Sequence, residues 1–282
     1  MINKNDCLLA RKILFAFLIT GILGLIIGTF YDLEINQVLF NRGSFFSDFF
    51  KGSGEIPMTL LIMAASFSLI RINFLEKRRL ERSLLPIIII ITFSFVSART
   101  IPGYFKIDNQ IISVSITMAY LLVSYSLSLL VKNKDAKDVR KYASFIIFIV
   151  LTSLFVMFLM KNIWGRQRFI SLIETNNLDN FTRWYKPQSW AANDSFKSFP
   201  SGHTSSAATV LVLLFYRSVF KENKYKILII AFAVLFPILV FFSRMVDGAH
   251  YLTDVSMAFV LVSLITLLYS KKFFEMQYVR NN

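Results

Sequence analysis

Long apolar runs dominate the chain, and residues 13–31 and 142–160 are the clearest of them. About 20 residues at a rise of 1.5 Å span the ~30 Å hydrocarbon core of a bilayer, so runs of this length predict transmembrane helices. We expect spans at approximately 13–31, 57–72, 84–99, 111–131, 142–160, 201–220, 227–245 and 253–270. The sequence therefore predicts a single all-α domain over 1–282, a polytopic membrane helical bundle of about eight transmembrane helices.

Basic residues are concentrated in alternate loops of this scheme. Segments 71–82, 132–141 and 221–226 are basic, as are both ends of the chain. The other loops are 32–56, 100–110, 161–200 and 246–252. Because cytoplasmic loops carry excess Lys and Arg, we expect cytoplasmic termini and place the second set of loops outside. We interpret the N-terminal apolar run as a retained anchor, since no small-residue cleavage site follows it.

The net charge of +14 would indicate nucleic-acid binding in a soluble domain. In a membrane protein the basic cytoplasmic loops account for it, so we expect no nucleic-acid partner. The lone Cys7 excludes an intramolecular disulfide, and no Cys/His cluster indicates zinc. The sequence does not define the oligomeric state.

The chain has only two histidines, and both lie beside residues suited to phosphate chemistry. Three elements carry the candidate chemistry: Lys161-x6-Arg168, Pro200-Ser201-Gly202-His203 and Ser243-Arg244-x5-His250-x3-Asp254. In the predicted topology all three fall on the outer side of the membrane. The external loop 161–200 also holds all three tryptophans, which suit either an interfacial aromatic belt or a wall for a lipid substrate.

Cleavage of a phosphate ester needs fixed donors that neutralise the phosphoryl oxygens. Lys161, Arg168 and Arg244 are candidates, since a guanidinium fork matches phosphate and an ammonium supplies a compact charge. Ser201 and Gly202 lie at the expected start of the sixth span, where free backbone N–H groups favour an anion. Gly202 permits close approach, and Ser201 can donate its hydroxyl proton.

The reaction also needs a nucleophile and an acid. Asp254 follows His250 by four residues, so on a helix the two would share a face. An aspartate that accepts a hydrogen bond from one imidazole nitrogen makes the other a better nucleophile. His203 is then available to protonate the leaving oxygen. We expect Arg166 to be an anchor or a supporting contact rather than a catalytic group.

The three elements resemble the three-part signature of the type 2 phosphatidic acid phosphatase (PAP2) superfamily, which shares its site with vanadium haloperoxidases. The resemblance covers about residues 142–270, and order and spacing agree. It implies that His250 attacks phosphorus to give a phosphohistidine, supported by Asp254, while His203 acts as acid and then activates water. It also implies that Lys161, Arg168, Ser201, Gly202, His203 and Arg244 hold the phosphate, with no metal and no cofactor.

Two features depart from the family pattern. Phe169 stands where the family usually has Pro after the arginine of the first element. The family core commonly has six spans, so the expected eight leave an extra pair upstream of the catalytic core.

These features predict a lipid phosphatase that acts on a phosphomonoester or diphosphate at the periplasmic face of a bacterial inner membrane. Undecaprenyl diphosphate, phosphatidic acid, phosphatidylglycerophosphate and lipid A are candidate substrates, and the long basic and aromatic loop slightly favours lipid A. One alternative is a lipid phosphotransferase that passes the phosphate to another lipid. A second is a non-enzymatic transporter or scaffold, but the charges cluster at the ends of spans rather than at mid-depth.

Overall fold

The structure, a computed structural model, describes residues 4–104, 108–220 and 225–274. It is 81% helical, with no strand in these ranges. The long helices are α1 (Lys4–Leu39), α3 (Ile56–Leu75), α4 (Glu81–Tyr104), α5 (Gln110–Leu129), α6 (Ala136–Trp164), α10 (Lys226–Val246) and α11 (Leu252–Phe274). The short ones are α2 (Phe45–Ser53), α7 (Phe169–Glu174), η1 (Leu178–Asn180), η2 (Asp194–Phe196), α8 (Gly202–Ala208), η3 (Thr209–Phe215) and α9 (Tyr216–Phe220). The predicted fold class, an all-α polytopic bundle, is confirmed.

Within the described ranges, seven helical segments are long and apolar enough to cross a membrane. These are Asn5–Leu39, Phe45–Leu75, Glu81–Tyr104, Gln110–Leu129, Ala136–Glu174, Lys226–Val246 and Leu252–Phe274. Each overlaps one of the spans expected from the sequence, and the span expected at 111–131 ends two residues earlier, at Leu129. Together they indicate an integral membrane protein.

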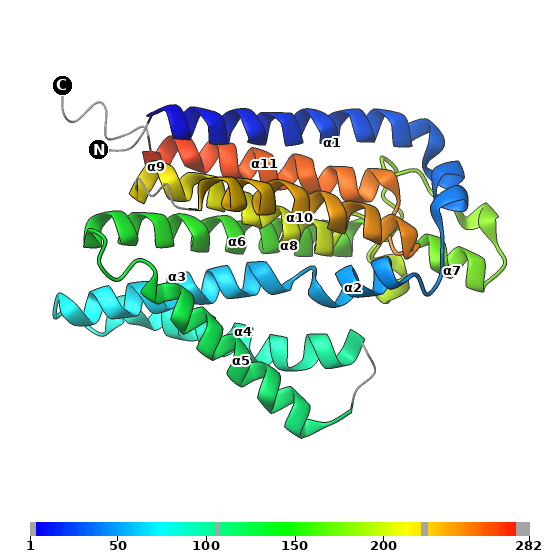
Figure 1. Cartoon of the computed structure of the whole chain (residues 1–282). Helices are drawn as coiled ribbons and strands as arrows, with labels where there is room; N and C mark the ends of the chain where they lie inside the picture. The colour runs from blue at the N-terminus through cyan, green and yellow to red at the C-terminus, as the bar shows by residue number, and fades with distance from the viewer. Residues whose placement is uncertain (1–3, 105–107, 221–224, 275–282) are drawn as a thin grey trace.

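The remaining expected span, 201–220, is not a continuous α-helix. It consists of α8, η3 and α9 end to end, with a 3₁₀ stretch of seven residues in the middle. This segment runs the length of the bundle (Figure 1), and most of its residues are buried among the other helices.

The expectation that 32–56 is a loop was wrong, because most of that segment is helical. Helix α1 continues past its apolar run to Leu39, and α2 fills 45–53. Two polar residues of this extension form hydrogen bonds with the turn that precedes α11 and with the first turn of α11. Asn36 Nδ2 donates to the His250 carbonyl at 3.1 Å, and Asp32 accepts from the Thr253 N–H at 3.0 Å. These bonds satisfy buried polar groups and hold the end of α1 in place.

Helix α1 lies along α11 over most of its length (Figure 1). Gly21, Gly24 and Gly28 line this contact, and a Cβ atom at any of them would come within 2.8 Å of Ser256, Val260 or Thr253. Small residues allow the two backbones to approach closely, as they do in many membrane helix pairs. The first and last described helices are therefore neighbours.

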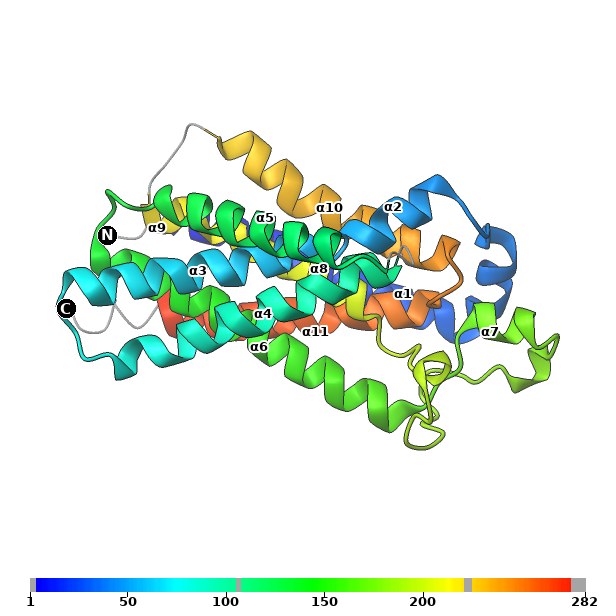
Figure 2. The same cartoon turned by 90° about the horizontal axis from the view of Figure 1, so that it is seen from below.

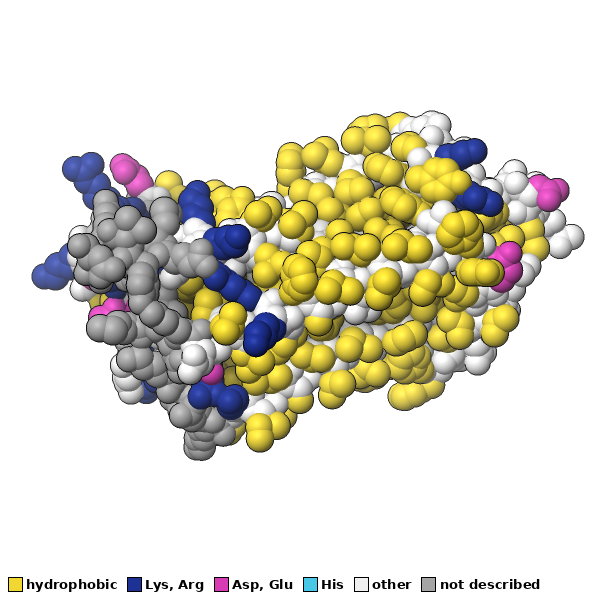
Figure 3. Space-filling model, turned by 90° about the horizontal axis from the view of Figure 1, so that it is seen from above, with side chains coloured by type: hydrophobic (Ala, Val, Ile, Leu, Met, Phe, Trp, Pro, Cys, Tyr) yellow, Lys and Arg dark blue, Asp and Glu magenta, His cyan; other side chains and the backbone are white. Residues whose placement is uncertain are grey.

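Helices α4 and α5 pack against α3 and against each other, on the side away from α1 and α11 (Figures 1 and 2). The face in Figure 3 is apolar along its middle, with Lys and Arg side chains gathered near the end where the termini lie. The opposite end holds α7, the start of α8 and the α10–α11 turn (Figure 1). All three candidate elements are at that end.

Candidate active site

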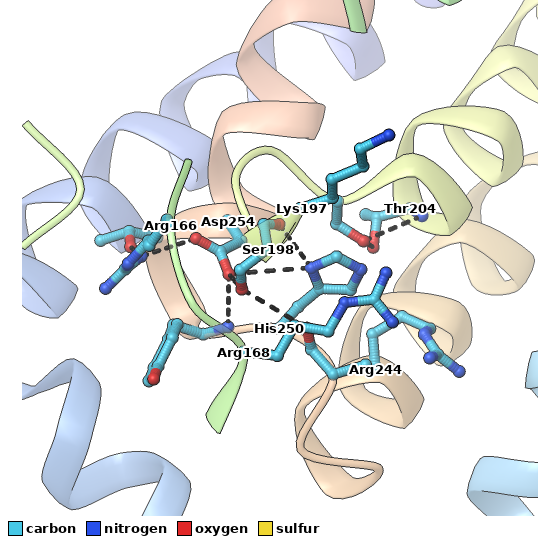
Figure 4. A network of polar contacts seen from close by, with 12 residues as sticks. Arg166, Arg168, Lys197, Ser198, Thr204, Arg244, His250 and Asp254 are labelled. Carbon is cyan, nitrogen blue, oxygen red and sulfur yellow. Dashed lines mark hydrogen bonds and ion pairs between the residues drawn. The ribbon is translucent and has the colours of Figure 1, made fainter. Parts of the chain in front are cut away.

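Backbone hydrogen bonds join the three candidate elements. The Ser198 N–H donates to the Arg166 carbonyl at 3.0 Å, the Ser201 N–H donates to the Asp254 carbonyl at 3.0 Å, and the Ile170 N–H donates to the Gly248 carbonyl at 2.8 Å. Segments that are far apart in sequence are thus fixed at one point. The side chains of the site converge there (Figure 4).

His250 is buried, and its tautomer follows from its partner. Nδ1 lies 2.6 Å from the carbonyl oxygen of Ser198. Because a carbonyl can only accept, Nδ1 carries the proton, and Nε2 of the neutral ring keeps its lone pair. Burial lowers the pKa of His250 to about 3, although the neighbouring Asp254 opposes the shift. The imidazole is therefore neutral near pH 7, as a nitrogen nucleophile must be.

The relation between His250 and Asp254 differs from the expectation. His250 lies in the turn before α11, not on it, and Asp254 is in the first turn of that helix. The nearest Asp254 oxygen is 3.7 Å from Nδ1, too far for a hydrogen bond. The Ser198 carbonyl takes the place that the sequence suggested for the carboxylate. Asp254 adds negative charge close to the ring.

Asp254 is held by other groups. It accepts a hydrogen bond from Arg166 Nη1 at 2.6 Å, one from the Tyr251 N–H at 2.8 Å and one from the Ser198 hydroxyl. Figure 4 shows Asp254 between Arg166 and His250, with Arg168 and Arg244 on the other side of the imidazole. The carboxylate is thus oriented on three sides.

Arg166 is the centre of a buried ionic network, which agrees with the supporting contact expected for it. It is 1% exposed, and Nη2 donates to Asp32 at 2.9 Å while Nη1 reaches Asp254. The guanidinium also lies 4.1 Å from the centroid of the Tyr251 ring. Two carboxylates around one guanidinium match its planar fork and compensate for its burial.

The role of Asp32 was missed in the sequence, where it was assigned to an external loop. One signal was available: an acidic residue that directly follows an apolar run is costly in a membrane unless it is paired. Nothing in the spacing pointed to Arg166 as the partner.

Lys161 lies against the turn that begins α8. Its Nζ donates to the Lys197 carbonyl at 3.1 Å. A Cβ atom at Gly202 would be 3.2 Å from Lys161 Cε and 3.5 Å from Nζ, so glycine leaves room for the ammonium. Ser201 caps α8, and its hydroxyl oxygen accepts from the Thr204 hydroxyl at 2.9 Å. Its own proton stays available for donation.

His203 faces two residues from upstream helices. Its Nδ1 is 3.9 Å from Glu55 Oε1, and the centroids of its ring and the Tyr104 ring are 5.2 Å apart. Glu55 lies at the junction of α2 and α3, and Tyr104 ends α4. The sequence reasoning missed both, since neither belongs to a spaced motif with His203.

Several buried side-chain nitrogen atoms of this cluster have no hydrogen-bond partner among the described residues. They are Arg244 Nε and Nη1, Arg168 Nε and His203 Nε2. Arg244 Nη2 donates to Asp247 at 2.7 Å, and Arg168 Nη2 donates to Asp194 at 3.0 Å. Unsatisfied buried donors cost free energy, and an anion with several oxygens would satisfy them.

Phe169, which stands in place of the expected proline, begins α7 and is 1% exposed. The first position of a helix also suits proline, so the substitution keeps the local geometry. Its ring packs edge-on against Phe40, with centroids 5.5 Å apart. The aromatic side chain thus fixes the end of α1 beside the site.

Two of the three tryptophans fold the long loop onto the second element. Trp164 and Trp184 lie on Phe199, with ring centroids 5.0 and 5.9 Å away, and Trp184 Nε1 donates to Thr29 at 2.9 Å. Trp190 is 66% exposed. Only Trp190 is thus placed as a belt residue or a lipid-facing wall would be.

The fold and the site define a class: a polytopic helical membrane protein with an anion-binding histidine and arginine cluster at one end of its bundle. The model of the PAP2 superfamily matches residues 142–277, so this part of the chain carries a PAP2 superfamily domain. Proteins with this domain are generally phosphatases that act on phosphate esters. Neither the search of curated proteins nor that of solved structures found a match.

Proposed function

We propose that the protein is a lipid phosphatase that hydrolyses a phosphomonoester or diphosphate of an amphiphilic lipid through a phosphohistidine. The observation that carries this proposal is the pairing of a neutral His250, whose Nε2 is free, with buried guanidinium and imidazole nitrogen atoms that lack partners. Lys161, Arg168, Ser201, Gly202 and Arg244 bind the phosphate, and the positive charges of the lysine and the two arginines stabilise the transition state.

In the first step His250 Nε2 attacks phosphorus and the bond from phosphorus to the leaving oxygen breaks. His203 gives its proton to that oxygen, and the lipid alcohol or phosphate leaves. Once the phosphate is bound, its negative charge and that of Glu55, whose Oε1 lies 3.9 Å from Nδ1, favour the protonated form of His203 before this transfer. The Ser198 carbonyl and Asp254 stabilise the positive charge that develops on His250.

In the second step the neutral His203 takes a proton from water. The resulting hydroxide attacks phosphorus, the P–N bond breaks, and phosphate leaves with His250 restored. The same two histidines thus complete both halves of the reaction, and every proton is returned.

The placement of the site supports a location outside the cytoplasm. Among the described residues, the basic segments 71–82 and 132–141 lie at the end of the bundle opposite the cluster (Figure 1), which under the positive-inside rule favours an external position for the cluster end. We place the chain in a bacterial inner membrane with both termini cytoplasmic and the site facing the periplasm. The candidate substrates are lipid A, undecaprenyl diphosphate, phosphatidic acid and phosphatidylglycerophosphate. Residues 142–270 form the catalytic core of a single membrane domain.

The decisive experiment is phosphate release by purified protein from these four lipids, with and without EDTA and with His250→Ala as the blank. Metal-independent release from one lipid, absent in the blank, is expected. Release by His250→Ala equal to wild type would refute the nucleophile. Transfer of the phosphate to an added acceptor lipid, without release of free phosphate, would identify a phosphotransferase instead.

A further inference from the structure

A cavity of about 370 Å³ lies beside the candidate site, in the part of the bundle built by α3, α4 and α5. Its wall also takes Leu151 and Leu154 from α6 and Ser206 from α8. Most of this wall comes from helices upstream of the PAP2 domain match at 142–277. The proposed reaction of the previous section assigns it no role.

The cavity is continuous with the acid side of the site. Glu55 and Tyr104 line it, and these are the two residues that contact His203. His203 protonates the leaving oxygen in the proposed reaction, so the leaving group departs towards this side. The cavity therefore begins where the bond between phosphate and lipid would break.

Most of the rest of the wall is apolar, and two of its hydroxyl groups bond to their own helix. The Ser97 hydroxyl donates to the Ser94 carbonyl at 3.0 Å, and the Thr100 hydroxyl donates to the Val96 carbonyl at 2.8 Å. Hydroxyls that bond to their own helix turn their carbon atoms outward. With Met58, Phe93 and Leu154 these residues form a hydrocarbon surface behind the polar pair Glu55 and Tyr104. The cavity is thus polar at the end next to His203 and apolar in its interior. This arrangement suits an amphiphile whose polar group lies at the site and whose hydrocarbon chain enters the cavity.

The size of the cavity suits one chain rather than a whole lipid. An apolar protein cavity of ~150 Å³ holds one benzene molecule, so by simple scaling 370 Å³ holds roughly fifteen carbon atoms. We propose that this cavity binds a hydrocarbon chain of the leaving group, and that α4 and α5 thereby set the chain length the enzyme prefers. This inference rests on the proposed phosphatase function.

The test is hydrolysis of a series of monoalkyl phosphates, with chains of about two to twenty-two carbons, in detergent micelles of fixed composition. Wild type is expected to gain kcat/KM with each methylene until the cavity is full. Val96→Trp, which fills the cavity, should end that gain at a shorter chain. The matched control is Val123→Trp on α5, since Val123 is 45% and Val96 49% exposed, and Val123 does not line the cavity.

Inhibition by inorganic phosphate should be the same in wild type and both tryptophan variants, because none changes the phosphate site. Leu154→Ala, which enlarges the cavity, should extend the gain to longer chains and serves if Val96→Trp does not fold. Identical chain-length profiles in wild type, Val96→Trp and Leu154→Ala would overturn the inference while leaving the phosphatase intact. Failure of the proposed function would look different: folded wild type would release no phosphate from any member of the series.

Discussion

The tautomer of His250 is set by a backbone carbonyl. This shows which site residues the sequence could predict and which contacts it could not. The histidines, Lys161, the two arginines and Asp254 are visible in the sequence because their side chains recur at fixed spacings. The acceptor at Nδ1 is the main chain of Ser198, and a carbonyl leaves no mark in a sequence. Glu55 and Asp32 were missed for a related reason: each meets its partner across more than a hundred residues.

Asp32→Asn tests the buried ionic network. It leaves Arg166 with one carboxylate in place of two, and removing one member of a buried ion pair costs about 3 to 5 kcal/mol. We expect a loss of about 3 kcal/mol in the free energy of unfolding, measured by denaturation in detergent micelles. Glu34→Gln on the exposed face of the same helix is the control and should change stability by less than about 0.5 kcal/mol. Equal effects of the two variants would contradict the network.

The buried His250 makes stability depend on pH. Its pKa is about 3 in the folded protein, whereas an unfolded histidine has a pKa of about 6.5. The unfolded state therefore binds the extra proton between these values, and stability falls as the pH drops below 6.5. Between pH 7.5 and pH 5 this amounts to about 2 kcal/mol, at ~1.4 kcal/mol per pH unit below 6.5.

Unfolding of wild type and His250→Gln at the two pH values measures this difference. The variant should lose about 2 kcal/mol less than wild type over the same interval. An equal loss in both proteins would mean that the imidazole is not held neutral by the fold.

At the scale of elements, seven of the eight spans expected from hydrophobic runs correspond to long helices. The eighth, 201–220, is helical too, but the runs did not predict its 3₁₀ stretch. The apolar residues within 201–220 predicted a helical span, yet η3 winds the chain more tightly at Thr209–Phe215. The apolar content of a segment indicates that it is buried or lies in a membrane. It does not indicate whether its backbone forms α-helical or 3₁₀ hydrogen bonds. The length of α1 was likewise underestimated, because its last turns are stabilised by Asp32 and Asn36 rather than by apolar contacts.

Gly202→Ala tests how the start of α8 holds Lys161. The added methyl group would lie 3.2 Å from Lys161 Cε, so the ammonium has to move away from the phosphate. We expect the inhibition constant of inorganic phosphate to rise about tenfold, equivalent to 1.4 kcal/mol. Gly103→Ala is the matched control, since a Cβ atom there meets nothing within 4 Å. Unchanged phosphate binding in Gly202→Ala would show that Lys161 does not depend on this contact.

At the scale of the molecule, the alternation of basic loops predicted that all the candidate chemistry would meet at one end, and the structure places it there. That argument needed only the order of the spans. It could not predict that helices upstream of the PAP2 domain contribute Asp32, Glu55 and Tyr104 to the same end. Contacts between helices depend on side-chain packing, which hydropathy does not encode.

A split protein tests this dependence. A fragment of residues 136–282 holds the whole matched domain but lacks α1 to α5. We expect no phosphate release from it alone, because Arg166 loses Asp32 and His203 loses Glu55. Coexpression with residues 1–135, cut in the loop before α6, should restore activity. Full activity of the fragment alone would show that the upstream helices are dispensable.

The bond between Asp32 and Thr253 also has a consequence in time. The two residues are 221 positions apart, so a ribosome adding ~5–20 residues per second needs roughly 10 to 45 seconds between them. Until α11 is inserted beside α1, neither Arg166 nor the His250 turn has its final support. The candidate site of a nascent chain is therefore not fully assembled until synthesis has reached α11.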